Sequence, residues 1–175
     1  FGRAEGLREE SRDWVSHDLT PRQLCDLELL LNGGFSPLTG FMSAADYGSV
    51  CADMRLSGGT LWPIPITLDV PEATADKLSR GDTLALRDAE GVMLAVLNVE
   101  DLWRPDREAE AEAVFGTTNT EHPGVAQLLQ STEPICLGGR LEGVQPVSHY
   151  DYRGLRHTPA ELRAEFERLG WARVV

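Results

Sequence analysis

Residues 82–102 read DTLALRDAEGVMLAVLNVEDL, and this stretch decides the fold class of the chain. It predicts two strands, 82–87 and 92–102, joined by a hairpin turn in which Gly91 can take a positive φ. The run 94–97 holds only apolar side chains, which indicates a strand buried on both faces. The centre of the chain is therefore expected to be a β-sheet.

Two further β segments are expected around this hairpin. Residues 62–70 predict an extended edge strand, because Pro63 and Pro65 each remove a donor from the hydrogen-bond ladder. Residues 135–147 predict one or two strands, broken by the glycine pair at 138–139.

The clearest helix signal begins at Thr20. Its hydroxyl can cap the helix, Pro21 fits the first helical position, and Gln23 completes a capping box. Gly33 ends the helix. One face of the helix is apolar and carries Leu24, Leu27, Leu30 and Leu31. This spacing is typical of an amphipathic helix.

Shorter helices are predicted between the strands, and residues 1–18 are polar and predict irregular structure. Ser43 caps one short helix that runs to about Met54, with Asp46 at its third position. Three more short helices or turns are predicted at 71–80, 106–115 and 122–130. Strands in the middle with short helices between them favour an α+β domain around a small, mostly antiparallel barrel.

Residues 155–175 predict the start of a separate α/β unit. Thr158 caps a helix that ends at Gly170, and an apolar strand is expected to begin in 171–175 with no other segment left to pair with it. The helix carries an apolar stripe of Leu162, Phe166 and Leu169. We therefore divide the chain into domains 1–154 and 155–175, and expect the last helix to dock on the barrel, pair with a neighbouring molecule, or be mobile.

Charge and apolar content limit the classes of partner. The chain has 175 residues, with 16 basic and 28 acidic side chains and a net charge of −12. That charge repels phosphate backbones and anionic membranes. No apolar run approaches the roughly 20 residues that span a bilayer. We therefore expect no nucleic-acid partner and no membrane location.

The three cysteines indicate the compartment rather than a reaction. Cys25, Cys51 and Cys136 lie far apart and form no C-x-x-C pair, so neither a zinc site nor a redox motif is indicated. Cys25 lies in an apolar helical stripe and Cys136 in a strand-like run, and both are expected to behave as buried free thiols. A cytoplasmic location fits best.

A search for a self-contained active site begins with lysine and glycine. Lys77 is the only lysine, and its polar neighbours indicate a solvated surface residue rather than a nucleophile. The glycine pairs at 33–34, 58–59 and 138–139 fit helix exits, turns or bulges better than phosphate cradles. The pair at 138–139, followed by Arg140, is the best of the three as an anion site.

The histidines, acidic residues and tryptophans give no stronger candidate. The histidines lack metal-ligand spacing: His17, His122, His149 and His157. His122 is expected at a helix entry, and His157, beside Arg156, is a weak functional candidate. A solvated helix face is expected for Glu108, Glu110 and Glu112. Core or interdomain packing is expected for Trp14, Trp62, Trp103 and Trp171. We therefore name no catalytic, cofactor-binding or metal-binding residue.

Several ordered blocks of the chain resemble the ATP sulfurylase (sulfate adenylyltransferase) family. They are Leu19-Thr20 with the leucine helix after it, GFSPLTGFM at 34–42, WPIPITL at 62–68, AVFGT at 113–117, EHPGV at 121–125, YRGLRHTP at 152–159 and GWARVV at 170–175. The resemblance covers most of the chain from about Leu19 onward, which makes it far more specific than one short motif.

The resemblance implies a PUA-like pseudo-barrel of mostly antiparallel strands with short peripheral helices, then the first helix and strand of a Rossmann-like nucleotidyltransferase domain. The full enzyme of this family joins ATP (with Mg) and sulfate into adenylyl sulfate and pyrophosphate. Its nucleotide-binding motifs are expected a few residues past Val175. The resemblance therefore implies an inactive fragment, with no cofactor of its own, whose partner is its own catalytic domain. Whether an adenylylsulfate kinase domain follows, as in some relatives, stays open.

Two other roles stay open as alternatives. PUA-like barrels elsewhere bind RNA, so the chain could be a free-standing binding module, although a net charge of −12 argues against RNA. Because members of the family often form oligomers, a structural or oligomerisation role is the other alternative, with a homo-oligomer as its product.

Overall fold

The computed structural model describes residues 3–174 and has a mixed α+β fold built on one six-stranded sheet. The strands are β1 (Val15–Asp18), β2 (Gly40–Phe41), β3 (Leu68–Val70), β4 (Thr83–Arg87), β5 (Met93–Trp103) and β6 (Ile135–Gly143). Their order in the sheet is β1-β4-β5-β6-β2, and β3 pairs with β6 beside β2. Only the β1–β4 pair is parallel. The predicted α+β class with mostly antiparallel strands is confirmed.

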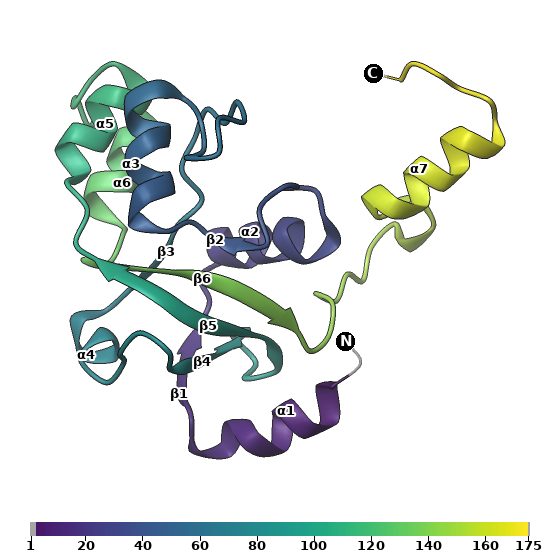
Figure 1. Ribbon diagram of the computed structural model, residues 1–175, viewed down its shortest axis with the longest axis horizontal. Helices are drawn as coiled ribbons and strands as arrows, with labels where there is room; N and C mark the ends of the chain where they lie inside the picture. The colour runs from purple at the N-terminus through teal and green to yellow at the C-terminus, as the bar shows by residue number, and fades with distance from the viewer. Residues whose placement is uncertain (1–2, 175) are drawn as a thin grey trace.

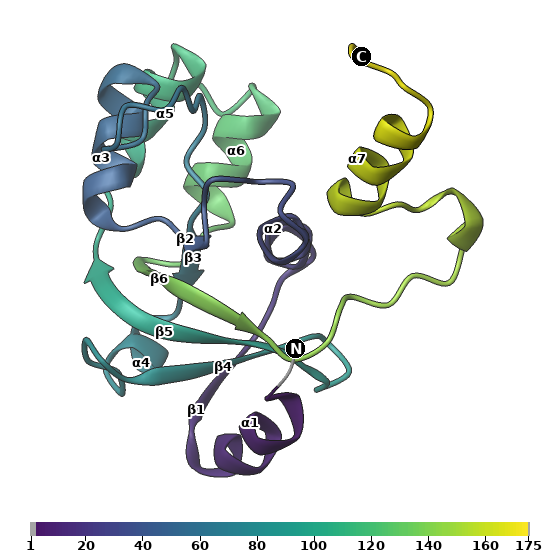
Figure 2. The same ribbon diagram turned by 45° about the vertical axis from the view of Figure 1, so that its right-hand side comes forward.

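Most of the helices lie around the sheet, and the last one lies apart from it (Figures 1 and 2). The helices are α1 (Ala4–Glu10), α2 (Pro21–Asn32), α3 (Ala44–Asp53), α4 (Glu72–Ala75), α5 (Arg107–Phe115), α6 (Pro123–Gln130) and α7 (Pro159–Arg168), with 3-10 turns η1 (Ser11–Asp13) and η2 (Arg153–Leu155). Figures 1 and 2 show α1 and α2 on opposite faces of the sheet, and α3, α5 and α6 gathered beyond one end of it.

The β4–β5 hairpin forms the centre of the sheet, as residues 82–102 predict. Leu84 pairs with Leu97 and Ala85 with Val96, and all four are buried. Because successive side chains point to opposite faces, the leucines pack against α2 while Ala85 and Val96 pack against α1. The expected burial of the 94–97 run on both faces is confirmed.

The glycine pair at 138–139 does not break β6, so the expectation of a broken strand is wrong. A Cβ on Gly138 would lie 2.3 Å from the Met42 carbonyl oxygen, and one on Gly139 would lie 2.0 Å from the Asn98 carbonyl oxygen. The two glycines therefore let the neighbouring backbones approach β6 from both sides. They keep the strand in the sheet rather than ending it.

The N-terminal segment is also more ordered than its polar sequence predicts. Residues 4–13 form α1 and η1, and 15–18 form the parallel edge strand β1. Leu7 is the buried side chain that anchors α1 on the sheet, beside Met93, and Ala4 packs against the same core. One leucine and one alanine in a charged helix leave only a weak periodic signal, which is why the sequence does not predict it.

The segment after Trp62 is extended only at its end. The strand β3 begins at Leu68 and pairs with β6 alone, so the edge position is confirmed while the predicted length is too great. Pro63 and Pro65 precede the paired part, in agreement with their missing N–H groups.

The last part of the chain stands apart from the rest. We call residues 3–147 the body and residues 148–174 the arm; Figures 1 and 2 show α7 away from the body at the end of an extended segment. The predicted helix and its Thr158 cap are confirmed. Residues 171–174 form no strand, since no neighbouring strand is there to pair with them. Val175 lies outside the described residues.

Candidate functional site

The most elaborate polar arrangement in the body is a buried cluster around Asp69 on β3. One carboxylate oxygen of Asp69 accepts from Arg22 Nη2 at 2.5 Å and from Gln23 Nε2 at 3.1 Å, and the other accepts from the backbone N–H of Glu133 at 2.8 Å. Gln23 also donates to the Asp69 carbonyl at 2.7 Å. Asp69 and Gln23 are both buried, so these bonds join α2 to β3 in the interior.

A second cluster lies between α3, α5 and β6. Glu110 accepts from the Tyr47 hydroxyl and from Arg107 Nη1, each at 2.9 Å. Arg107 Nη2 donates to Cys136 Sγ at 3.3 Å and to the Glu133 carbonyl at 3.5 Å. Glu133 therefore contacts both clusters. Together the two clusters join α2, α3, α5 and the strands β3 and β6.

Burial favours the neutral forms of the tyrosine and the cysteines in and beside the second cluster. Burial, with the nearby Glu110 carboxylate, raises the pKa of Tyr47. Burial also raises the pKa of Cys136 to about 11, partly offset by the Arg107 guanidinium. Burial is also the main cause of the raised pKa of Cys51. Since a thiolate rather than a thiol is the nucleophile, neither cysteine is activated. The arrangement holds elements of the body together.

The structure corrects one predicted residue of this cluster. Glu110 was expected on a solvated face with Glu108 and Glu112, yet only 7 % of it is exposed. Its two neighbours in the pattern are exposed. The i, i+3 pair of Arg107 with Glu110 is the sequence signal that identifies it, because the arginine compensates the buried charge.

The structure shows the surroundings of the lysine and of two of the glycine pairs. Lys77 is exposed, as predicted. Gly33 takes φ +81 and ends α2. The glycines at 138–139 face the carbonyl oxygens of Met42 and Asn98, which would repel an anion, so this candidate is not supported.

The structure does not bring the four histidines together. His17 Nε2 lies 3.1 Å from Gln23 Oε1, and His149 Nε2 lies 2.7 Å from Glu28 Oε1. His122 is the N-cap of α6, as predicted, and its ring packs on Phe115 at 5.1 Å. His157 is exposed. Within residues 3–174, no group of three His, Cys, Asp or Glu side chains is placed to hold one metal ion.

The predictions for cysteine and tryptophan are correct only in part. Cys136 is buried, but Cys25 is exposed on α2, so its predicted burial is wrong. Cys25 lies next to Leu24 in sequence, but its side chain lies outside the buried leucine face of the helix. Core packing is confirmed for Trp14 and Trp62, which pack against the two cores. Trp171 of the arm is 57 % exposed, so it is not in a core, and its interdomain packing stays a prediction.

Two hollows lie on the surface of the protein near α2. A depression of about 390 Å³ lies beside the first cluster and is lined by Thr20, Pro21, Arg22, Asp69, Gln127, Ser131 and Thr132. A mostly apolar groove of about 170 Å³ lies between α2 and the start of the arm and is lined by Glu28, Leu31, Asn32, Pro146, Val147 and Thr158. Among residues 3–174, no helix is both long enough and apolar enough to cross a membrane.

Comparison with known proteins gives consistent relatives. The chain is 50% identical over 166 residues to sulfate adenylyltransferase of Saccharomyces cerevisiae, covering 95% of this chain and 32% of that protein. It is 52% identical over 160 residues to the same enzyme of Chaetomium globosum, covering 90% of this chain and 28% of that one. The resemblance to this family is confirmed, and the chain spans about a third of the length of the curated relatives it matches.

A solved structure and a family model match over the same region. A hexameric APS kinase from Thiobacillus denitrificans superposes with a TM-score of 0.75 at 37% identity, over 98% of this chain and 30% of that one. The model of the PUA-like domain matches residues 2–146. The chain therefore belongs to the PUA-like domain family.

Proposed function

We propose that this chain is the N-terminal part of a sulfate adenylyltransferase, an enzyme that joins ATP (with Mg) and sulfate into adenylyl sulfate and pyrophosphate. In this proposal residues 1–154 form the PUA-like domain and residues 155–175 begin the catalytic domain. The observation that carries the proposal is the identity of about half, over nearly the whole chain, to enzymes of that name that are about three times as long.

The role we propose for the body is that of a rigid support. Transfer of an adenylyl group needs preorganised positive groups around the phosphate charge that develops in the transition state. The body is acidic, and its described arginines in the buried clusters are paired with carboxylates. A tied, packed body can hold a catalytic domain in place without supplying chemistry to it.

The arm is the proposed contact with that catalytic domain. Its stripe of Leu162 and Leu169 is exposed and Phe166 is only half-buried. An amphipathic helix gains stability mainly by burying its apolar face, so an uncovered stripe marks a surface for another unit. The three free cysteines fit a reducing compartment, and a cytoplasmic location is part of the proposal.

A chimera tests the proposal. Residues 1–175 replace the matching region of the S. cerevisiae enzyme, and pyrophosphate release from ATP and sulfate is measured. We expect the chimera to retain activity and residues 1–175 alone to release no pyrophosphate. A folded, soluble chimera without activity would contradict the proposed support, and turnover by residues 1–175 alone would contradict the proposed inactivity.

Oligomerisation is a second candidate role, favoured by the exposed apolar arm; the structural neighbour is described as hexameric. Light scattering on the 175-residue chain tests it. A dimer or larger species that the double variant Leu162→Glu, Leu169→Glu converts to a monomer would support this role, and a monomer at all concentrations would exclude it for this segment.

A further inference from the structure

Few bonds hold the arm to the body. Upstream of it, Val144 N–H donates to the Leu94 carbonyl at 2.8 Å and Arg8 Nη2 donates to Gln145 Oε1 at 2.6 Å. The next side-chain bond to the body is His149 Nε2 to Glu28 Oε1, at 2.7 Å. For residues 150–174, the hydrogen bonds in the structure all stay within the arm.

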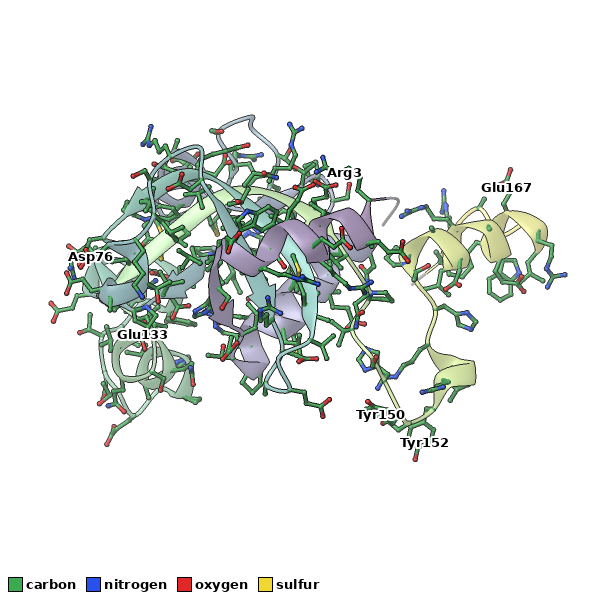
Figure 3. The ribbon with its side chains drawn as sticks, turned by 90° about the horizontal axis from the view of Figure 1, so that it is seen from below. Arg3, Asp76, Glu133, Tyr150, Tyr152 and Glu167 are labelled. Carbon is green, nitrogen blue, oxygen red and sulfur yellow. The ribbon has the colours of Figure 1, made fainter. Side chains whose placement is uncertain are left out.

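Beyond His149 the arm is exposed but internally ordered. Arg153 Nε donates to the His149 carbonyl at 2.9 Å, and Arg156 pairs with Asp151 at 3.1 Å. Tyr150 and Tyr152 are 81% and 75% exposed, and Figure 3 shows both pointing away from the body. The bonds of this segment therefore hold it together internally, and His149 is its side-chain link to the body.

We propose that His149 and Glu28 form a proton-dependent latch that sets the orientation of the arm on the body. Histidine is the side chain whose charge changes between about pH 5 and 8, so a bond from imidazole to carboxylate is an ion pair only on the acid side of that range. This inference concerns the contact between body and arm and does not rest on the proposed function.

The apolar groove beside the latch indicates which surface the arm covers while His149 is bonded to Glu28. Leu31 and Asn32 of α2 form one wall, while Pro146, Val147 and the arm residue Thr158 form the other. When His149 holds Glu28, the arm covers this face of α2. Release of the latch moves Thr158 away from Leu31 and opens the groove.

The charges around His149 come from two elements. From α2 the facing group is Glu28, and from the arm they are Asp151, whose lowered pKa owes most to Arg156 with a smaller contribution from His149, and Arg153, which bonds the His149 carbonyl. Glu28 is the charged group that His149 bonds directly, so the latch is an ion pair only where the imidazole is protonated, and it is expected to be stronger at pH 5.5 than at pH 8.

The expected size is modest. The side chains of His149 and Glu28 are 28% and 34% exposed, so solvent screens the pair. Pairs of this kind shift an equilibrium by about fivefold at most. We expect the ratio of latched to released arm to fall about two- to fivefold from pH 5.5 to pH 8.

Distance measurements between two spin labels test the latch in the 175-residue chain. One label is placed on Cys25, which is exposed on α2, and the other on the exposed α7 position through Glu167→Cys, in a Cys51→Ser background. We expect one narrow distance population at pH 5.5 and a broader distribution at pH 8. His149→Gln and Glu28→Gln should each give the broad distribution at both values.

His157→Gln is the matched control, because His157 lies on the same arm and has no described carboxylate bond to the body. It should keep the wild-type response. Equal distributions at pH 5.5 and 8 in the wild type, or a response lost in His157→Gln but kept in His149→Gln, would overturn the latch. Unchanged urea unfolding of each variant shows that the body remains folded.

Discussion

The helices α2 and α7 begin with the same local signals and end in different surroundings. Each has a threonine N-cap, a proline at the first helical position and a complete capping box. In the body, α2 buries Gln23, Leu27 and Leu30, whereas α7 in the arm buries no residue. A short stretch of sequence can thus start a helix by itself, but whether its apolar face is covered depends on what the chain places opposite it.

The apolar side chains show the same contrast over the whole molecule. The body places most of its large apolar residues in two cores on the two faces of the sheet and in a small one between α5 and α6. The arm leaves seven of them exposed: Tyr150, Tyr152, Leu155, Leu162, Leu169, Trp171 and Val174. The body is therefore a finished packing unit, and the arm is a surface that can be covered.

The largest expected difference comes from truncating one leucine in each region. Leu97 is fully buried in the central hairpin, so Leu97→Ala should lower the free energy of unfolding by about 4 kcal/mol. Leu162 is 37% exposed, and Leu162→Ala should change it by less than about 0.5 kcal/mol. Urea unfolding measures both. Equal losses would mean that the arm is packed on the body in solution.

A pair of aspartates bonded to arginines sharpens the comparison. Asp69 is buried and holds Arg22, Gln23 and Glu133, so Asp69→Ala should cost about 3 kcal/mol by leaving these donors without their acceptor. Asp151 pairs with Arg156 in the arm and is open to solvent. Asp151→Ala should leave the unfolding free energy unchanged, and a large loss there would contradict the view that only the body depends on tied charges.

Alkaline pH should weaken the body through Cys136. Its pKa is raised from 9.0 to about 11, so the folded state keeps a proton that the unfolded state loses. The stabilisation is complete below pH 9 and is lost as the pH rises towards about 11, a loss of about 2 kcal/mol. Cys136→Ala should reduce the fall of the unfolding free energy between pH 9 and about 11. Cys25→Ala, which changes an exposed thiol, is the control. A slope that Cys136→Ala leaves unchanged would refute the assignment.

The smallest effects come from the two threonine caps. Thr20→Ala should lower the unfolding free energy of the body by about 1 kcal/mol, because the cap of a packed helix is lost. Thr158→Ala should reduce helical circular dichroism of the arm without moving the unfolding midpoint. The bond from the Thr158 backbone lowers the pKa of Glu161, so acid should weaken the same helix as Glu161 is protonated. If Thr158→Ala also moved the unfolding midpoint, the result would mean that the body and the arm unfold as one unit.

Local chemistry explains which elements were predictable. The capping box of α2, the Ser43 cap of α3 and the β4–β5 hairpin are recorded in neighbouring residues, and all three are confirmed. The helix α1 depends on Leu7 finding the far face of the sheet, and the continuity of β6 depends on backbones approaching Gly138 and Gly139. Such contacts join residues distant in sequence, so no local pattern reports them.

The sequence by itself determined the class of fold, the capped helices, the central hairpin and the family resemblance, because caps, turns and alternation act over a few residues. Only the tertiary structure decided that Glu110 is buried with Tyr47 and Arg107, that Asp69 ties α2 to the sheet, and that His149 meets Glu28. Burial and charge pairing depend on which surfaces the folded chain brings together. For that reason a carboxylate in an exposed-looking pattern became an interior group, while the leucines of α7 remained at the surface.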